Sequence, residues 1–164
     1  MNAIEAMKTR VSIRKYKKQV ILKEILIDLV DCAHMAPSGY NHQPWTFLVI
    51  TDEEILKRVA KVAQSGQFIM NAGACIMVFC KKGVETALED ACAATENIIT
   101  AANCYGLGTC WVNTFQKSQS HDIKCAVNCP QELELMTMLA VGYPDEEKIT
   151  NKKSLSEVLQ WDTF

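Results

Sequence analysis

Residues 74–80 constrain the fold of this chain more than any other segment, because all seven are apolar. A run of this length matches one β-strand and falls far short of the ~18 residues that a membrane-spanning helix needs. A strand without a polar face has to be covered on both sides. We therefore expect residues 74–80 to form a central strand in a sheet that helices cover on each face.

Strands and helices alternate along the rest of the chain. Apolar residues at helical spacing predict the helices, and short runs rich in apolar and β-branched residues predict the strands. The expected helices are 2–9, 23–35, one that opens at 51–54, 85–104, 119–127 and 154–160; the expected strands are 46–50, 74–80, 109–112 and 135–143. No linker or internal repeat interrupts the pattern, so we expect residues 1–164 to form a single domain.

Composition and charge exclude several classes of protein. Hydrophobic residues make up 49% of the chain, which indicates either a well-filled core or an oligomer that hides part of its apolar surface. The formal net charge is −2 and the basic residues form no stripe, so we expect no nucleic-acid partner. No apolar run could span a membrane, and the N-terminus lacks the apolar centre of a signal peptide, so we expect a cytoplasmic protein.

The eight cysteines do not follow the spacing of a metal site. No Cys-x-x-Cys pair occurs, and Cys125 and Cys129 lack the second pair that would complete a zinc or iron–sulfur site. Cys75 and Cys80 lie within the apolar run 74–80. We expect buried, reduced thiols and no metal; a metal or redox role for the cysteines is the alternative.

A basic face is predicted near the N-terminus. In an extended chain Arg10, Ser12 and Arg14 point to one side, because successive side chains alternate. Two guanidinium groups around a hydroxyl suit an anion such as phosphate; a solvated basic edge strand is the alternative. The chain lacks the glycine patterns of nucleotide-binding loops, so side chains must do most of the binding. Candidates to complete the site are Lys148, Lys152 and Lys153.

Residues 36–45 read as a rigid polar turn between an apolar helical run and an apolar strand. Pro37 and Pro44 restrict the backbone, and Gly39 permits conformations that other residues avoid. Hydrogen-bonding side chains come from Ser38, Asn41, His42 and Gln43. Such a loop suits a flat heterocycle with polar edges better than it suits a metal ion or a catalytic triad.

Four segments in a fixed order resemble those of the nitroreductase family of flavoproteins: 9–16, 37–45, 106–111 and 141–144. The resemblance extends over nearly the whole chain. It implies FMN as the cofactor and an α+β fold in three layers, with a central mixed, mainly antiparallel sheet flanked by helices. It also implies a homodimer with the flavins at the interface, where both subunits touch each flavin.

The resemblance further implies which residues bind the cofactor. Arg10 and Arg14 would bind the phosphate and its surroundings, with Ser12 near the ribityl chain or the ring. Lys152 and Lys153 would close the phosphate site from the C-terminal part of the chain.

The flavin ring would be bound from both subunits. The loop that the second subunit lays along the ring would contribute Pro37, Ser38, Gly39 and Asn41. Within the chain itself, Asn71 would reach the pyrimidine edge of the ring. The backbone that passes the reactive edge would be that of Trp111, Val112 and Asn113. Many relatives have glycine where Asn113 stands, so a side chain is expected there instead.

Contacts with the substrate are expected from Tyr40, His42 and Phe68. The chain is shorter than the better-known members of the family, which suggests a more open pocket with residues 64–68 at its rim. Phe68 would stack on a substrate, and packing in the core is the alternative. The alternatives are a hydrogen bond within the loop for His42 and dimer packing for Tyr40. The implied chemistry needs no obligatory acid or base, so we assign no catalytic residue.

The implied function is that of an FMN-dependent oxidoreductase. It would take hydride from NADH or NADPH and reduce nitroaromatic, quinone or similar conjugated acceptors by a ping-pong mechanism. The alternatives are a flavin-binding module that senses redox state without turnover, and a thiol-rich protein that binds zinc. Because Trp161 and Phe164 are aromatic, the C-terminal tail is expected to dock onto the body or onto the partner subunit.

Overall fold

The computed structural model describes all residues 1–164 and contains one four-stranded sheet. Its strands are β1 (Trp45–Ile50), β2 (Ala74–Lys81), β3 (Gly108–Asn113) and β4 (Leu133–Gly142), in the order β1-β2-β4-β3. β2 lies inside the sheet and residues 74–80 are buried, which confirms the predicted central strand. All neighbouring strands are antiparallel; the only parallel pairing is an isolated bridge between Ser12 and Thr109.

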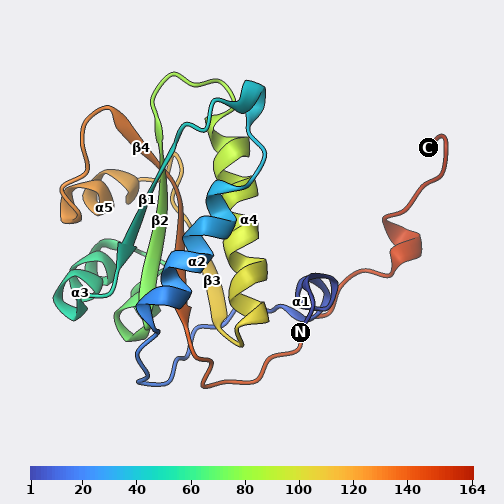
Figure 1. Cartoon of the computed structure of the whole chain (residues 1–164), viewed down its shortest axis with the longest axis horizontal. Coiled ribbons are helices and arrows are strands. Elements are labelled where there is room, and N and C mark those ends of the chain that lie inside the picture. The colour runs from blue at the N-terminus through green and yellow to red at the C-terminus, as the bar shows by residue number, and fades with distance from the viewer.

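Helices cover both faces of the sheet, which confirms the α+β class and the three layers (Figure 1). One face carries α2 (Lys23–His34) and α4 (Ala87–Cys104); the other carries α3 (Glu53–Val62), the 3₁₀ helix η2 (Gln67–Asn71) and α5 (Ser120–Ala126). The remaining helices are α1 (Ala3–Thr9), η1 (Gly39–Asn41) and η3 (Leu155–Glu157). None of these helices combines the length and the apolar composition that crossing a membrane requires.

Alternating side chains of β2 divide the core into two layers. Ile76 and Val78 belong to the apolar cluster with α2 and α4, whereas Cys75 and Met77 belong to the cluster with α3. A polar side chain in either row would be buried without water. This two-sided burial explains why residues 74–80 include no polar position.

The N-terminal segment 10–17 packs against the end of the sheet and forms no strand of its own. The Ile13 N–H donates a hydrogen bond of 2.9 Å to the Thr109 carbonyl of β3. Gly108 permits this approach, because a Cβ atom there would lie 2.7 Å from Ile13 Cγ1. A glycine at the start of β3 therefore allows the basic segment to lie along that strand.

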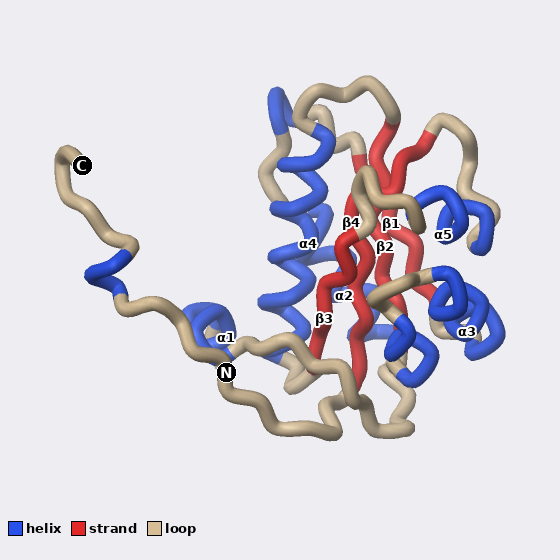
Figure 2. The backbone as a smooth tube through the Cα atoms, turned by 180° about the vertical axis from the view of Figure 1, so that it is seen from behind, coloured by secondary structure: helices blue, strands red, loops and turns tan.

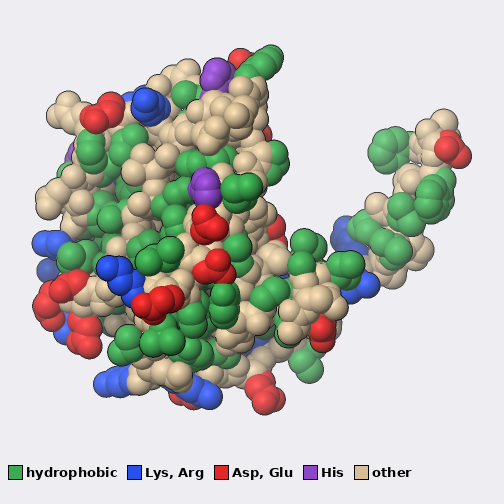
Figure 3. All heavy atoms as spheres, viewed as in Figure 1, with side chains coloured by type: hydrophobic (Ala, Val, Ile, Leu, Met, Phe, Trp, Pro, Cys, Tyr) green, Lys and Arg blue, Asp and Glu red, His purple; other side chains and the backbone are tan.

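The C-terminal tail leaves the body of the protein (Figure 2). Residues 147–164 are all exposed, and the hydrogen bonds of η3 join only near neighbours. Trp161 is 78% exposed, and Figure 3 shows apolar side chains along the tail, apart from the body. The tail does not dock onto its own body; docking onto a partner subunit stays a prediction.

Candidate functional site

The predicted basic face lies along β3, which is an edge strand of the sheet. Ser12 pairs with Thr109 of β3, so Arg10 and Arg14 flank this pairing along the chain. Arg10 and Ser12 are half-buried and Arg14 is exposed. The structure thus brings the three residues to one edge of the sheet.

An aromatic ring and an amide side chain lie near Arg14, at one end of the basic face. The Arg14 guanidinium carbon lies 5.9 Å from the centroid of the Phe68 ring, a distance at which cation–π attraction operates. Phe68 is partly buried against the core beside α3, so packing also holds the ring. Asn71, on the same 3₁₀ helix, lines a cavity together with Arg14.

A second cation approaches β3 from the chain beyond β4. Burial raises the pKa of the Cys110 thiol, and the positive charges of Arg14 and Lys148 oppose part of this rise. Both cations therefore lie near this β3 residue. Lys152 and Lys153, which were expected to close the phosphate site, lie in the exposed tail. Within one chain it is Lys148 that reaches the basic face.

One carboxylate lies among these cations. Glu146 Oε1 accepts hydrogen bonds from the backbone N–H groups of Arg14 (2.5 Å) and Lys15 (3.0 Å). The same oxygen lies 3.2 Å from Lys148 Nζ. The Arg14 N–H, followed by Lys148 and the Lys15 N–H, holds the pKa of Glu146 below its ordinary value. No sequence motif had singled out Glu146, because its role depends on contacts with residues more than a hundred positions away.

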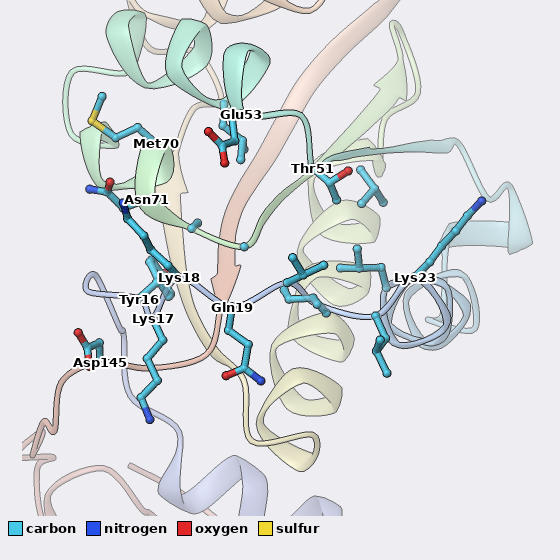
Figure 4. Close-up of a pocket in the computed structure, with 18 of the residues that line it drawn as sticks. Tyr16, Lys17, Lys18, Gln19, Lys23, Thr51, Glu53, Met70, Asn71 and Asp145 are labelled. Carbon is cyan, nitrogen blue, oxygen red and sulfur yellow. The ribbon is translucent and has the colours of Figure 1, made fainter.

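A cavity of about 1370 Å³ begins at Arg14 and extends beneath the ends of the strands (Figure 4). In Figure 4, Asn71 and Met70 lie on one side, Glu53 extends from α3, and the segment crossing below carries Lys17, Lys18 and Gln19. Apolar side chains also line it, among them Val20, Ile21 and Leu22. Because Arg14 belongs to the basic face and also lines the cavity, the cavity adjoins the basic face.

Loop 37–44 has a strained backbone that α4 holds in place. Positive φ angles occur at three non-glycine residues: Tyr40 (50°), Asn41 (58°) and Gln43 (46°). Asp90 of α4 is buried, and its Oδ1 accepts a hydrogen bond of 2.9 Å from the Gly39 N–H. Gly39 is needed because a Cβ atom there would lie 2.6 Å from Thr86. Contacts with α4 and its N-cap therefore hold the start of the loop.

The side chains of residues 40–43 in this loop face solvent, whereas Pro44 is buried. Tyr40 is 91% exposed, and its ring meets that of His42 edge to face at 5.7 Å. Ser38 Oγ accepts a hydrogen bond of 3.0 Å from the Gln43 N–H, so part of its hydrogen-bonding capacity is used within the loop. Pro37 is exposed as well. The loop thus presents polar and aromatic groups whose side-chain partners lie within the loop itself.

The loop and the basic face lie at opposite ends of the sheet. The loop leads into Trp45, which pairs with Cys80 near one end of β2. Thr109, the partner of Ser12, is level with Ala74 at the other end of β2, since both pair with Val141. Six residues along a strand span about 20 Å. Within one chain the loop and the Ser12 pairing are therefore separated by about 20 Å along the sheet.

The residues expected beside the reactive edge of the ring belong to β3 itself. The Val112 side chain is buried in the core, so only its backbone is available to a ligand. Trp111 is 37% exposed, and the Asn113 side chain is exposed. The Asn113 carbonyl accepts a hydrogen bond of 2.9 Å from Gln119 Nε2, which ties the end of β3 to the start of α5.

The cysteines and acidic residues form no metal centre. No group of three or more His, Cys, Asp or Glu side chains could hold a metal ion, and all eight cysteines are free. Cys75 and Cys80 are buried, and burial raises the pKa of Cys80 to about 12. These two thiols are therefore protonated and unreactive at neutral pH.

Comparison with known proteins adds independent support. The nitroreductase family profile matches residues 7–76, and a profile described as TM nitroreductase matches residues 58–163. A protein of Archaeoglobus fulgidus, named as an NADH dehydrogenase/NAD(P)H nitroreductase, is 34% identical over 146 residues, which cover 85% of this chain and 84% of that protein. An FMN-dependent nitroreductase from Clostridium difficile R20291 has a TM-score of 0.92 at 28% identity, covering 98% of this chain and 99% of its own.

A protein of Desulfovibrio desulfuricans, described as a nitroreductase in complex with FMN, has a TM-score of 0.87 at 27% identity. The alignment covers 100% of this chain and 98% of that protein. Iodotyrosine deiodinases also occur among the similar proteins.

Proposed function

The chain belongs to the nitroreductase family, and we propose that it is a cytoplasmic, FMN-dependent oxidoreductase that carries electrons from NADH or NADPH to small conjugated acceptors. One observation carries the proposal. Arg10, Ser12 and Arg14, the basic face, lie along β3. The Arg14 end of the basic face adjoins Phe68 and Asn71. The similarity to FMN-dependent and FMN-bound nitroreductase folds supports it.

The residues of the basic face and its neighbours fit a ligand with an anionic group at one end and a flat ring at the other. Arg10 and Arg14 are four residues apart, about 13 Å in extended backbone, so they would meet different parts of FMN. The ring would lie at the Arg14 end, where Phe68 offers an aromatic surface and Asn71 offers amide donors and acceptors. Arg10 and Ser12 would hold the phosphate and the ribityl chain.

When bound, FMN supplies the redox chemistry, accepting hydride from NAD(P)H and passing electrons to a nitroaromatic, quinone or similar acceptor. Arg14 and Lys148 would stabilise the negative charge that develops at the pyrimidine edge. Asn71 would orient that edge by hydrogen bonds. Donor and acceptor would occupy the same face in turn, which predicts ping-pong kinetics.

We propose that the protein works as a homodimer in which loop 37–44 of one subunit completes the cofactor site of the other. The distance of about 20 Å between the loop and the basic face within one chain supports this arrangement. Tyr40 and His42 would then meet the substrate of the second subunit. The tail would be covered in the same assembly, because it exposes Ile149, Leu155, Val158, Trp161 and Phe164. If the tail docks onto the partner subunit, Lys152 and Lys153 would lie close enough to bind the FMN phosphate there.

The proposal is tested by the visible spectrum of the purified protein and by anaerobic titration. We expect flavin absorbance that bleaches with NADH or NADPH and returns when a quinone or a nitroaromatic compound is added. A protein that does not bind added FMN would contradict the proposal. A flavin-loaded protein that neither nucleotide reduces would contradict NAD(P)H as the donor and favour the alternative, a flavin-binding module that senses redox state without turnover.

The assignment of the basic face has its own test. Replacing both Arg10 and Arg14 with alanine removes two cations that would hold the cofactor, so we expect the variant to release FMN on dialysis. Lys8→Ala is the matched control, because Lys8 is an exposed cation of α1 outside the basic face. Equal retention of FMN by the double variant and the control would remove the assignment.

A further inference from the structure

Glu146 is the acidic side chain that directly contacts the basic segment 10–17. Its Oε1 accepts from the N–H groups of Arg14 and Lys15 and lies 3.2 Å from Lys148 Nζ. The Glu146 side chain is 14% exposed and that of Lys148 is 34% exposed, so solvent screens this pair only in part. The Glu146 carboxylate is therefore placed among three cationic residues, Arg14, Lys15 and Lys148.

The Glu146 contacts extend a backbone pairing between residues 15–16 and residues 144–145. The Asp145 N–H donates a hydrogen bond of 2.9 Å to the Lys15 carbonyl, and Tyr16 forms an antiparallel bridge with Pro144. The Glu146 carboxylate adds the next contacts through its side chain. It thereby fixes the backbone from which the Arg14 guanidinium extends over Phe68.

The same carboxylate also limits where Lys148 can lie. The ion pair keeps the ammonium group near the basic face, close enough to Cys110 for its charge to act on that thiol. Glu146 thus holds one cation through a backbone hydrogen bond and the other through charge. It also cancels part of the positive charge that the two cations bring.

We propose that Glu146 is a positioning residue that sets the net charge beside the pyrimidine edge of the flavin and so lowers its reduction potential. This inference rests on the proposed function, because it requires the ring to lie at the Arg14 end. Reduction adds negative charge to the pyrimidine edge, which Arg14 and Lys148 favour and the Glu146 carboxylate opposes. Glu146 keeps both cations in place while it offsets one of their charges.

Glu146→Gln removes the negative charge and keeps the acceptor that positions Arg14. The amide oxygen still accepts from the Arg14 and Lys15 N–H groups, whereas the negative charge is gone. The midpoint potential of bound FMN is measured by anaerobic reduction in the presence of reference dyes. We expect the preference for reduced over oxidised FMN to rise about tenfold, a shift of about 30 mV to more positive potential for a two-electron couple.

Glu147→Gln is the matched control. Glu147 is the neighbouring residue and is exposed, so its replacement removes the same charge outside the cluster. We expect its potential to equal that of the unchanged protein. An unchanged or more negative potential in Glu146→Gln, or an equal rise in Glu147→Gln, would overturn the inference.

Lys148→Gln gives an independent measurement if Glu146→Gln loses the cofactor. Removing the cation is expected to shift the potential to more negative values, and a potential equal to that of the unchanged protein would overturn the inference. Failure of the unchanged protein to bind FMN would refute the proposed function and this inference with it. A loaded protein whose potential no variant alters would refute this inference alone.

Discussion

Asp90 Oδ1 accepts a hydrogen bond of 2.9 Å from the Gly39 backbone N–H, which joins the first turn of α4 to loop 37–44. Asp90 Oδ2 accepts a second bond of 2.9 Å from the Thr86 hydroxyl, and the residue is only 4% exposed. A buried carboxylate needs such donors to offset its lost hydration. The loop proposed to serve a second subunit is thus shaped by a helix of its own subunit.

Asp90→Ala should lower the free energy of unfolding by about 1–3 kcal/mol, because the Gly39 N–H and the Thr86 hydroxyl lose their acceptor. Chemical denaturation measures this change. Glu89→Ala is the control, since Glu89 is exposed on the same turn, and its effect should stay within about 0.5 kcal/mol. Equal losses in the two variants would show that the loop does not depend on Asp90.

Gly108→Ala should displace the basic segment from β3, because the added Cβ would lie 2.7 Å from Ile13 Cγ1. Overpacking of this kind costs about 1–3 kcal/mol of unfolding free energy. We also expect weaker FMN binding, since Ser12 and Arg14 flank Ile13 in the chain. Denaturation and fluorescence titration with FMN measure the two effects. Unchanged affinity for FMN would mean that the cofactor does not use this segment.

Glu146 should make the stability of the protein depend on pH in the acidic range. Its pKa is lowered in the folded state, so its contribution is fully present above the ordinary glutamate pKa and is lost as pH falls through the folded pKa. The difference in unfolding free energy between the unchanged protein and Glu146→Gln should therefore be largest near neutral pH and vanish in acid. Denaturation curves at several pH values test this, and a difference independent of pH would contradict it.

Deleting residues 160–164 should weaken the proposed homodimer. The deletion removes Trp161 and Phe164, and burying one large apolar side chain contributes about 1.5–3 kcal/mol, enough for at least a tenfold change in the dissociation constant. Sedimentation at several concentrations measures that constant. Asp162→Asn serves as the control, because it keeps both aromatic residues. A dimer of unchanged stability after the deletion would refute docking of the tail onto a partner.

Local patterns in the sequence were sufficient for most of the architecture. The helix expected at 85–104 is α4, which begins two residues later, and the strand expected at 135–143 is β4, which begins two residues earlier and ends one residue earlier. These elements follow from the spacing of apolar residues, a property of neighbouring positions. The segment 10–16, which was expected to be extended, pairs with the body only through isolated bridges, from Ser12 to Thr109 and from Tyr16 to Pro144.

The site was harder to predict because its parts are distant in sequence. The basic residues downstream of β4 looked equivalent in the sequence, yet only Lys148 is held beside Arg14 and Cys110 within the chain. Glu146 could not be predicted for the same reason, because the residues that it contacts at the basic face are distant in sequence. Its carboxylate accepts hydrogen bonds from two backbone N–H groups, and a pattern of side chains in the sequence cannot predict such bonds.

The sequence by itself determined the central strand, because residues 74–80 have no polar position and can only be stable when covered on both sides. It also indicated the family, because short motifs with special backbone and hydrogen-bonding needs occur in a fixed order. Only the tertiary structure placed the loop at 37–44 and the basic face at opposite ends of the sheet. Strand register and antiparallel pairing decide which residues are level with one another, and these depend on contacts between segments far apart in the chain.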